Sequence, residues 1–386
     1  MRKAESARPR RFAAAVPLLA LGAALALLSG LAGGLVRMGW PLLPERALAP
    51  VALHGALMVC GFFGFVISLE RAAALHQRLA WAAPALAALG TLAALALQPG
   101  AAALAWLAAG LVLTLAYAGV LRRTPVLHVA VEGAGALCWA GGTLLWMLDR
   151  PFSVVVAWWG SFLVLTIAGE RRELARFVPL SAGARSGYLA VLALQATALV
   201  VLAVPWHDHP LAAGAWWASM ALLALWLLRF DLACRAGIAR TGWALHTARC
   251  LRLGYAWLAL AGGWGVANAL RGMPLDAPGP LHMLLLGFVF SMVFGHAPIV
   301  LPALLRVQLP YHPRFYAPLL LLHLSVAGRV AGSLAGLPGL RQAAAWGSAL
   351  ALVVFIATML AAARSRRVPV SGRFLEPVQG QPRRAP

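Results

Sequence analysis

The sequence predicts an all-α protein, a polytopic transmembrane helix bundle of about twelve helices with both termini in the cytoplasm. Three observations lead to this prediction: long apolar runs recur, charged residues are scarce, and arginine-rich links alternate with arginine-poor ones. Of 386 residues, 62% are hydrophobic and only 11% are charged, whereas a soluble domain carries about 25% charged residues. About 20 helical residues cross a hydrocarbon core of about 30 Å, and apolar runs of that length fill most of the chain.

The predicted spans are separated by links rich in turn residues, such as Gln98-Pro99-Gly100 and Asp149-Arg150-Pro151. They cover residues 12–37, 51–69, 79–97, 101–120, 126–147, 152–169, 187–205, 210–228, 250–270, 281–304, 316–336 and 343–363. A basic N-terminal segment, 1–11, precedes this transmembrane domain, 12–363, and a polar tail, 364–386, follows it. We expect the tail to be disordered.

The distribution of basic residues predicts the orientation, because cytoplasmic links retain an excess of arginine and lysine. With the N-terminus inside, 26 of the 32 basic residues fall in inner segments and five in outer segments. Those five are Arg37, Arg46, Arg150, Arg271 and Arg341. This pattern is typical of a multi-pass protein of the bacterial inner membrane, with the lipid bilayer as its surroundings. The net charge of +21 does not indicate nucleic acid binding, since the arginines are divided among short links and form no continuous basic face.

Ionisable side chains at membrane depth are costly, so they are candidates for function. Five of the ten histidines lie inside predicted spans, namely His54, His128, His282, His296 and His323. Glu132 is the acid and Arg329 the base that we predict to be well buried there.

Depth divides these histidines into two groups. His54 and His282 lie within one turn of the outer ends of the second and tenth helices, which run in the same direction. Two imidazoles at one level suit a haem iron held between them, and the nearby Gly61 and Gly287 would give the ring room. Hydrogen bonds across the bundle are the alternative explanation for each histidine taken alone.

The inner group contains His128, Glu132, His296 and His323. At 1.5 Å per residue, His296 lies about 21 Å further along the tenth helix than His282. The three histidines of this group are candidate metal ligands, but a proton relay or a structural polar network would use the same residue types. Arg329 could neutralise Glu132, although it is expected nearer the membrane centre.

The pattern of helices and outer histidines resembles subunit I of the haem-copper oxidases. In that superfamily the corresponding pair ligates a low-spin haem, so the resemblance implies His54 and His282 as haem ligands. It also implies a haem propionate contact for Arg341, which occupies the outer link between helices eleven and twelve. The segments HGALMVCGFFGFVISLE and HMLLLGFVFSMVFGHAP, which begin at His54 and His282, resemble the NnrS family as well. Those polytopic bacterial proteins are proposed to bind haem and copper and are linked to nitric oxide metabolism.

The chain departs from the oxidases in ways that matter for copper. The oxidases carry copper ligands on helices six and seven, but 152–169 and 187–205 contain no histidine. The tenth helix has its second histidine, His296, fourteen residues after the first. An oxygen-reducing binuclear centre is therefore not expected, and copper is left open as a cofactor only through the resemblance.

The leading hypothesis is a membrane protein that binds haem b and acts in respiratory electron transfer or nitric oxide metabolism. Its partner would be a redox protein or a small gas molecule, and whether it is an enzyme stays open. The alternatives are a secondary transporter that couples through Glu132, Arg329 and the inner histidines, or a structural membrane subunit.

Overall fold

The computed structural model describes residues 8–42, 49–75, 77–204, 210–235, 237, 241–305 and 308–364. Helices and short links make up this part of the chain, and no strand occurs in it. Most of the segments predicted as a basic N-terminus and a polar tail lie outside the described residues, as does the link at 205–209.

Each of the twelve predicted spans coincides with a helix or with a continuous run of helical segments. The first seven runs are α1 (Arg8–Arg37), α2 to α4 (Ala49–Ala52, His54–Ala56, η1 Leu57–Phe63 and Gly64–Leu75), α5 (Ala82–Leu95) after the short η2 (Leu79–Trp81), α6 (Pro99–Arg123), α7 (Leu127–Met147), α8 (Phe152–Leu174) and α9 (Ala182–Ala203). The other five runs are α10 (Pro210–Phe230), α11 (Gly242–Leu270), the continuous α12, η4 and α13 (Pro278–His282, Met283–Val289 and Phe290–Leu305), α14 (Tyr316–Leu334) and α15 (Pro338–Arg364). Two short helical segments, η3 (Leu232–Cys234) and η5 (Pro313–Phe315), precede α11 and α14.

The helices have the length and composition of membrane spans. Within the described residues, nine helical segments are long and apolar enough to cross a membrane, and Leu21–Arg37 and Leu79–Leu95 form shorter apolar helices. Large apolar side chains face outward, for example Leu104, Leu115 and Leu320, each about 60% exposed. Exposure of so much apolar surface to water would be unfavourable, whereas contact with lipid tails is not. The chain is therefore a multi-pass membrane protein whose helices contact the bilayer.

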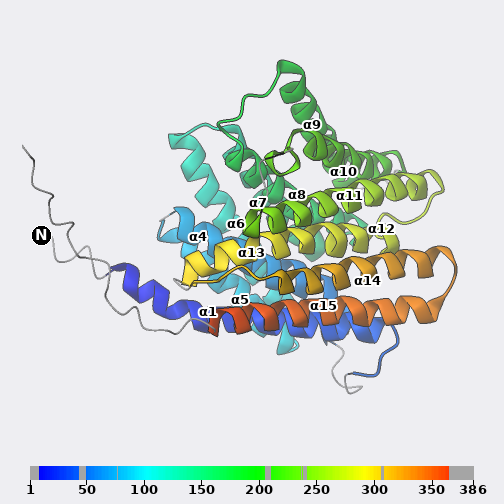
Figure 1. Ribbon diagram of the computed structural model, residues 1–386, viewed down its shortest axis with the longest axis horizontal. Coiled ribbons are helices and arrows are strands. Elements are labelled where there is room, and N and C mark those ends of the chain that lie inside the picture. The colour runs from blue at the N-terminus through cyan, green and yellow to red at the C-terminus, as the bar shows by residue number, and fades with distance from the viewer. Residues whose placement is uncertain are drawn as a thin grey trace, which may run out of the picture.

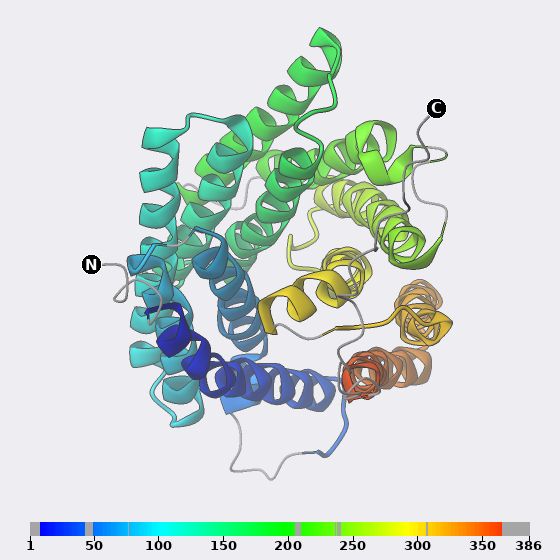
Figure 2. The same cartoon turned by 60° about the vertical axis from the view of Figure 1, so that its left-hand side comes forward.

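The bundle closes with its first and last helices side by side. α1 packs against α15, and α1 begins at the end of the bundle where α15 stops (Figure 1). The run α12–α13 passes through the interior, as the view along the helices shows (Figure 2). Of the nine spanning segments, those most enclosed by protein are α8, His54–Leu75 and Pro278–Pro302.

The two enclosed runs that carry His54 and His282 share a local irregularity. Each contains a seven-residue π-helical segment shortly after its histidine, Leu57–Phe63 in one and Met283–Val289 in the other. Gly61 and Gly287 both stand fifth in these segments. A Cβ atom on Gly287 would lie 2.6 Å from the Trp257 ring, and one on Gly61 would lie 2.8 Å from Thr91 Oγ1. The glycines therefore allow neighbouring helices to approach closely.

Candidate functional site

His54 and His282 line the same cavity, at one end of the bundle. The cavity has a volume of about 330 Å³, which lies within the range of small-molecule sites. It is enclosed by α1, the two π-containing runs, α8 and α15. The expectation that Gly61 or Gly287 would line it is wrong, since the glycines on its wall are Gly34 and Gly55.

Each imidazole is held by a backbone carbonyl through Nδ1. The distance from His54 Nδ1 to Gly30 O is 2.6 Å, and that from His282 Nδ1 to Pro278 O is 2.8 Å. Because a carbonyl oxygen can only accept, Nδ1 carries the proton in both rings, and Nε2 of a neutral ring keeps its lone pair. This is the arrangement in which a histidine is oriented for ligation by a second hydrogen bond.

The His54 ring packs closely against Gly34 of α1. A Cβ atom on Gly34 would lie 2.7 Å from His54 Cε1, so a larger residue there would displace the imidazole. The remaining wall of the cavity is largely apolar and aromatic. Its aromatic members are Phe63, Phe152, Trp159 and Phe290.

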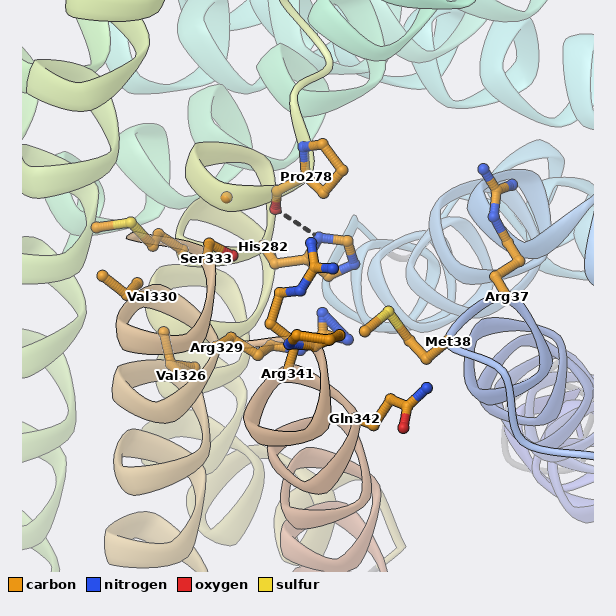
Figure 3. Close-up of a pocket in the computed structure, with 13 residues that line it drawn as sticks. Arg37, Met38, Pro278, His282, Val326, Arg329, Val330, Ser333, Arg341 and Gln342 are labelled. Atoms are coloured by element: carbon orange, nitrogen blue, oxygen red, sulfur yellow. Dashed lines mark hydrogen bonds between the residues drawn. The ribbon is translucent and has the colours of Figure 1, made fainter. Parts of the chain in front are cut away.

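Three arginines lie on one side of this cavity. Arg37, Arg329 and Arg341 line an adjoining cavity of about 240 Å³ together with His282, and Arg37 and Arg329 also reach the larger one. Figure 3 shows Arg329 and Arg341 beside His282, with Arg37 standing apart from them across the cavity.

These guanidinium groups lack carboxylate partners. No acidic residue lines the smaller cavity, Asp276 lines the larger one, and among the described residues none of the three arginines forms an ion pair. Arg329 Nε is buried without a hydrogen-bond partner. The arrangement can therefore bind an anionic group next to His282.

The inner histidines and Glu132 are not gathered into one site. His296 Nδ1 lies 2.8 Å from Met292 O, and its Nε2 lies 3.4 Å from Arg171 Nη1. His323 Nδ1 accepts a 2.8 Å hydrogen bond from Trp257 Nε1, while His128 is partly exposed on α7. Within the described part of the chain, no group of three or more His, Cys, Asp or Glu side chains is placed to hold a metal ion.

Glu132 pairs with Arg71, and not with Arg329. Arg71 Nη1 lies 3.4 Å from Glu132 Oε2, and the same guanidinium also contacts Glu170 and Glu173. The sequence interpretation missed this cluster because it ended the second and sixth spans at residues 69 and 169. α4 and α8 continue to Leu75 and Leu174. The available signal was the Glu-Arg pair that follows each of those predicted ends.

A second buried ion pair lies nearby. Arg171 Nε and Nη2 donate to Asp231 Oδ2 and Oδ1 at 2.7 and 2.9 Å, and Tyr255 Oη donates to Oδ2 at 3.0 Å. Arg171 is 7% and Asp231 3% exposed. This pair balances its charge one to one and fixes α8 against the segment that follows α10.

The fold and these sites define a class, the multi-pass helical membrane proteins with a paired-histidine cavity inside the bundle. The chain belongs to a family described as a domain of unknown function (DUF8744), which matches residues 16–364. No curated protein and no solved structure matches it.

Proposed function

We propose that the protein is a b-type haem protein of the bacterial inner membrane, with His54 and His282 as the two ligands of the haem iron. The observation that carries this proposal is the presence of two imidazoles on one cavity, each with Nδ1 bonded to a carbonyl and Nε2 free to ligate. Two imidazoles from separate helices are a suitable donor set for haem iron. The resemblance of these helices to the NnrS family and to oxidase subunit I supports the same assignment.

The other residues that line the two cavities suit the macrocycle and the propionates of haem. Phe63, Phe152 and Phe290 offer an apolar wall to a macrocycle, and Arg37, Arg329 and Arg341 offer guanidinium groups to its propionates. Haem, when bound, supplies reversible one-electron chemistry. Because His54 and His282 would both be committed to holding the iron, electron transfer with a redox partner is favoured over nitric oxide binding.

The donor set gives no support to copper. α8 and α9 contain no histidine, and the inner histidines lie in separate surroundings. The chain's part in the proposed function is therefore to ligate the iron, to neutralise the propionates and to exclude water from the ring.

Absorption spectroscopy tests the proposal. Protein produced with ample haem should purify with a Soret band, and His54→Ala or His282→Ala should each abolish the six-coordinate low-spin spectrum while the protein remains in the membrane. His323→Ala is the matched control, because His323 is also an intramembrane histidine but lies away from the cavity. Colourless wild-type protein would contradict haem binding and favour a transporter or a structural subunit.

A further inference from the structure

Arg71 is the centre of a buried cluster of carboxylates at the end of the bundle opposite the paired histidines. Its guanidinium contacts three acids: Glu132 at 3.4 Å, Glu170 at closer range and Glu173 at 3.5 Å. Glu70, the preceding residue on α4, adds a fourth carboxyl close by. Arg71 itself is 8% exposed.

The cluster has more negative groups than positive ones. Glu173 has a second partner in Arg176, at 3.8 Å and on the surface, whereas Glu132 and Glu170 have Arg71 alone. Several ionised carboxylates around one guanidinium repel one another strongly where water is scarce. Binding of a proton by one of them relieves this excess.

Burial indicates which carboxyl holds the proton. Glu132 is 2% exposed, and its Oε1 atom is buried without a hydrogen-bond partner. An ionised carboxylate in that position would be shielded from water, which is costly. The side chain lies against Gly169 of α8, where a Cβ atom would clash with it.

The groups that face Glu132 come from three neighbouring helices. They are Arg71 from α4, Tyr117 from α6, and Glu170 and Glu173 from α8, with His128 one turn earlier on α7. Glu70 of α4 interacts with Arg71, Glu170 and Glu173. Tyr117 is 2% exposed, and its hydroxyl also lacks a partner. A hydrogen bond between Glu132 and the Tyr117 hydroxyl would satisfy both atoms: a protonated Glu132 can donate it, and Tyr117 can donate it to an ionised one.

The carboxyls become more buried step by step from the surface inward. The side chain of Glu173 is 35% exposed, that of Glu170 19% and that of Glu132 2%. Glu173 and Glu170 are three residues apart and so share one face of α8. All three touch the same guanidinium, which gives a path of ionisable groups from solvent to the buried acid.

We propose that this cluster is a proton-binding site, loaded from the end of the bundle that the arginine bias places inside the cell, with Glu132 as the group that holds the proton. In the loading step a hydronium ion at Glu173 gives up its proton and leaves as water, and an O–H bond forms on Glu132. No electron moves, and no metal ion is needed. This proposal does not depend on haem binding.

Infrared spectroscopy on the purified full-length protein at neutral pH tests the assignment. The wild-type spectrum should contain the carbonyl stretch of a protonated carboxylic acid, shifted on exchange into D₂O, and Glu132→Gln should remove that band. Asp231→Asn is the matched control, because Asp231 is equally buried but has its own guanidinium; that variant should keep the band. A wild-type spectrum without the band, or a band that survives Glu132→Gln, would overturn the proposal.

Thermal unfolding gives a second and independent measurement. If Glu132 is neutral, glutamine replaces it with a neutral group of the same size, and Tm should stay close to that of the wild type. Glu170→Gln removes the closest anionic partner of Arg71, so its Tm should fall. An equal fall in both variants would mean that Glu132 is an ionised member of a purely structural network.

Discussion

At the scale of single residues, the state of His54 and His282 is determined by the backbone and not by other side chains. The carbonyls of Gly30 and Pro278 each hold one Nδ1–H group, which directs the ring as well as fixing its tautomer. Gly30 lies on α1, and Pro278 lies one turn before His282 on the same helix. The two histidines thus reach the same chemical state by a tertiary contact in one case and a local contact in the other.

The arginines on one side of the cavity should govern how tightly an anionic cofactor is held. A hydrogen bond to a charged group contributes about 1.5–3 kcal/mol, so Arg341→Gln should weaken haem retention roughly ten- to hundredfold. The absorption spectrum of the bound fraction should not change, because both imidazoles remain. Haem loss to apomyoglobin measures this effect.

Arg271→Gln provides the control for that measurement. Arg271 is another outer-link arginine, but it lies outside both cavities. Equal haem loss from the two variants would show that general surface charge, and not the cavity arginine, retains the cofactor.

At the scale of helices, apolar runs were enough to predict where the helices lie, since each predicted span coincides with one. Their ends were harder to predict. α4 and α8 extend beyond residues 69 and 169, because their polar last turns bury Arg71 and Arg171 against carboxylates of other segments. A linear sequence shows that these side chains are charged but not that a partner lies beside them. Depth along the helices correctly predicted that His54 and His282 line one cavity. It had already placed Arg329 nearer the membrane centre than Glu132, and Arg71 is the partner of Glu132.

The contact between α10 and α11 gives a test of packing at this scale. A Cβ atom on Gly262 would lie 2.5 Å from the Ala221 backbone nitrogen and 2.7 Å from Trp217 O, whereas nothing lies within 4 Å of one on Gly263. Gly262→Ala should therefore force the helices apart, and overpacking of this kind costs about 1–3 kcal/mol.

Gly263→Ala is the neighbouring control for that substitution. Alanine stabilises a helix relative to glycine by up to about 1 kcal/mol, so this variant should unfold at the wild-type temperature or slightly above it. Thermal unfolding in detergent compares the two. A Gly262→Ala protein as stable as Gly263→Ala would contradict the close α10–α11 contact.

At the scale of the whole molecule, two polar sites lie at opposite ends of the enclosed helices. His54 and Arg71 are on one continuous run, separated by about 25 Å at 1.5 Å per residue. Phe62, Phe63 and Phe290 fill part of the space between, with ring centroids 5.0 to 6.2 Å apart. This apolar layer separates the cavity from the carboxylate cluster.

The assignment of sides rests on the arginine distribution, and reporter fusions along the chain test it. With twelve spans and both termini inside, fusions at Arg123 and Arg176 should report a cytoplasmic location, and fusions at Pro99 and Asp276 an external one. The physical reason is that links rich in arginine are retained on the cytoplasmic side during insertion. The opposite result at two adjacent sites would remove the twelve-span topology. Inversion at all four sites would instead place the paired-histidine cavity on the cytoplasmic side and the Arg71 cluster on the outer side, so that any proton would be loaded from outside the cell.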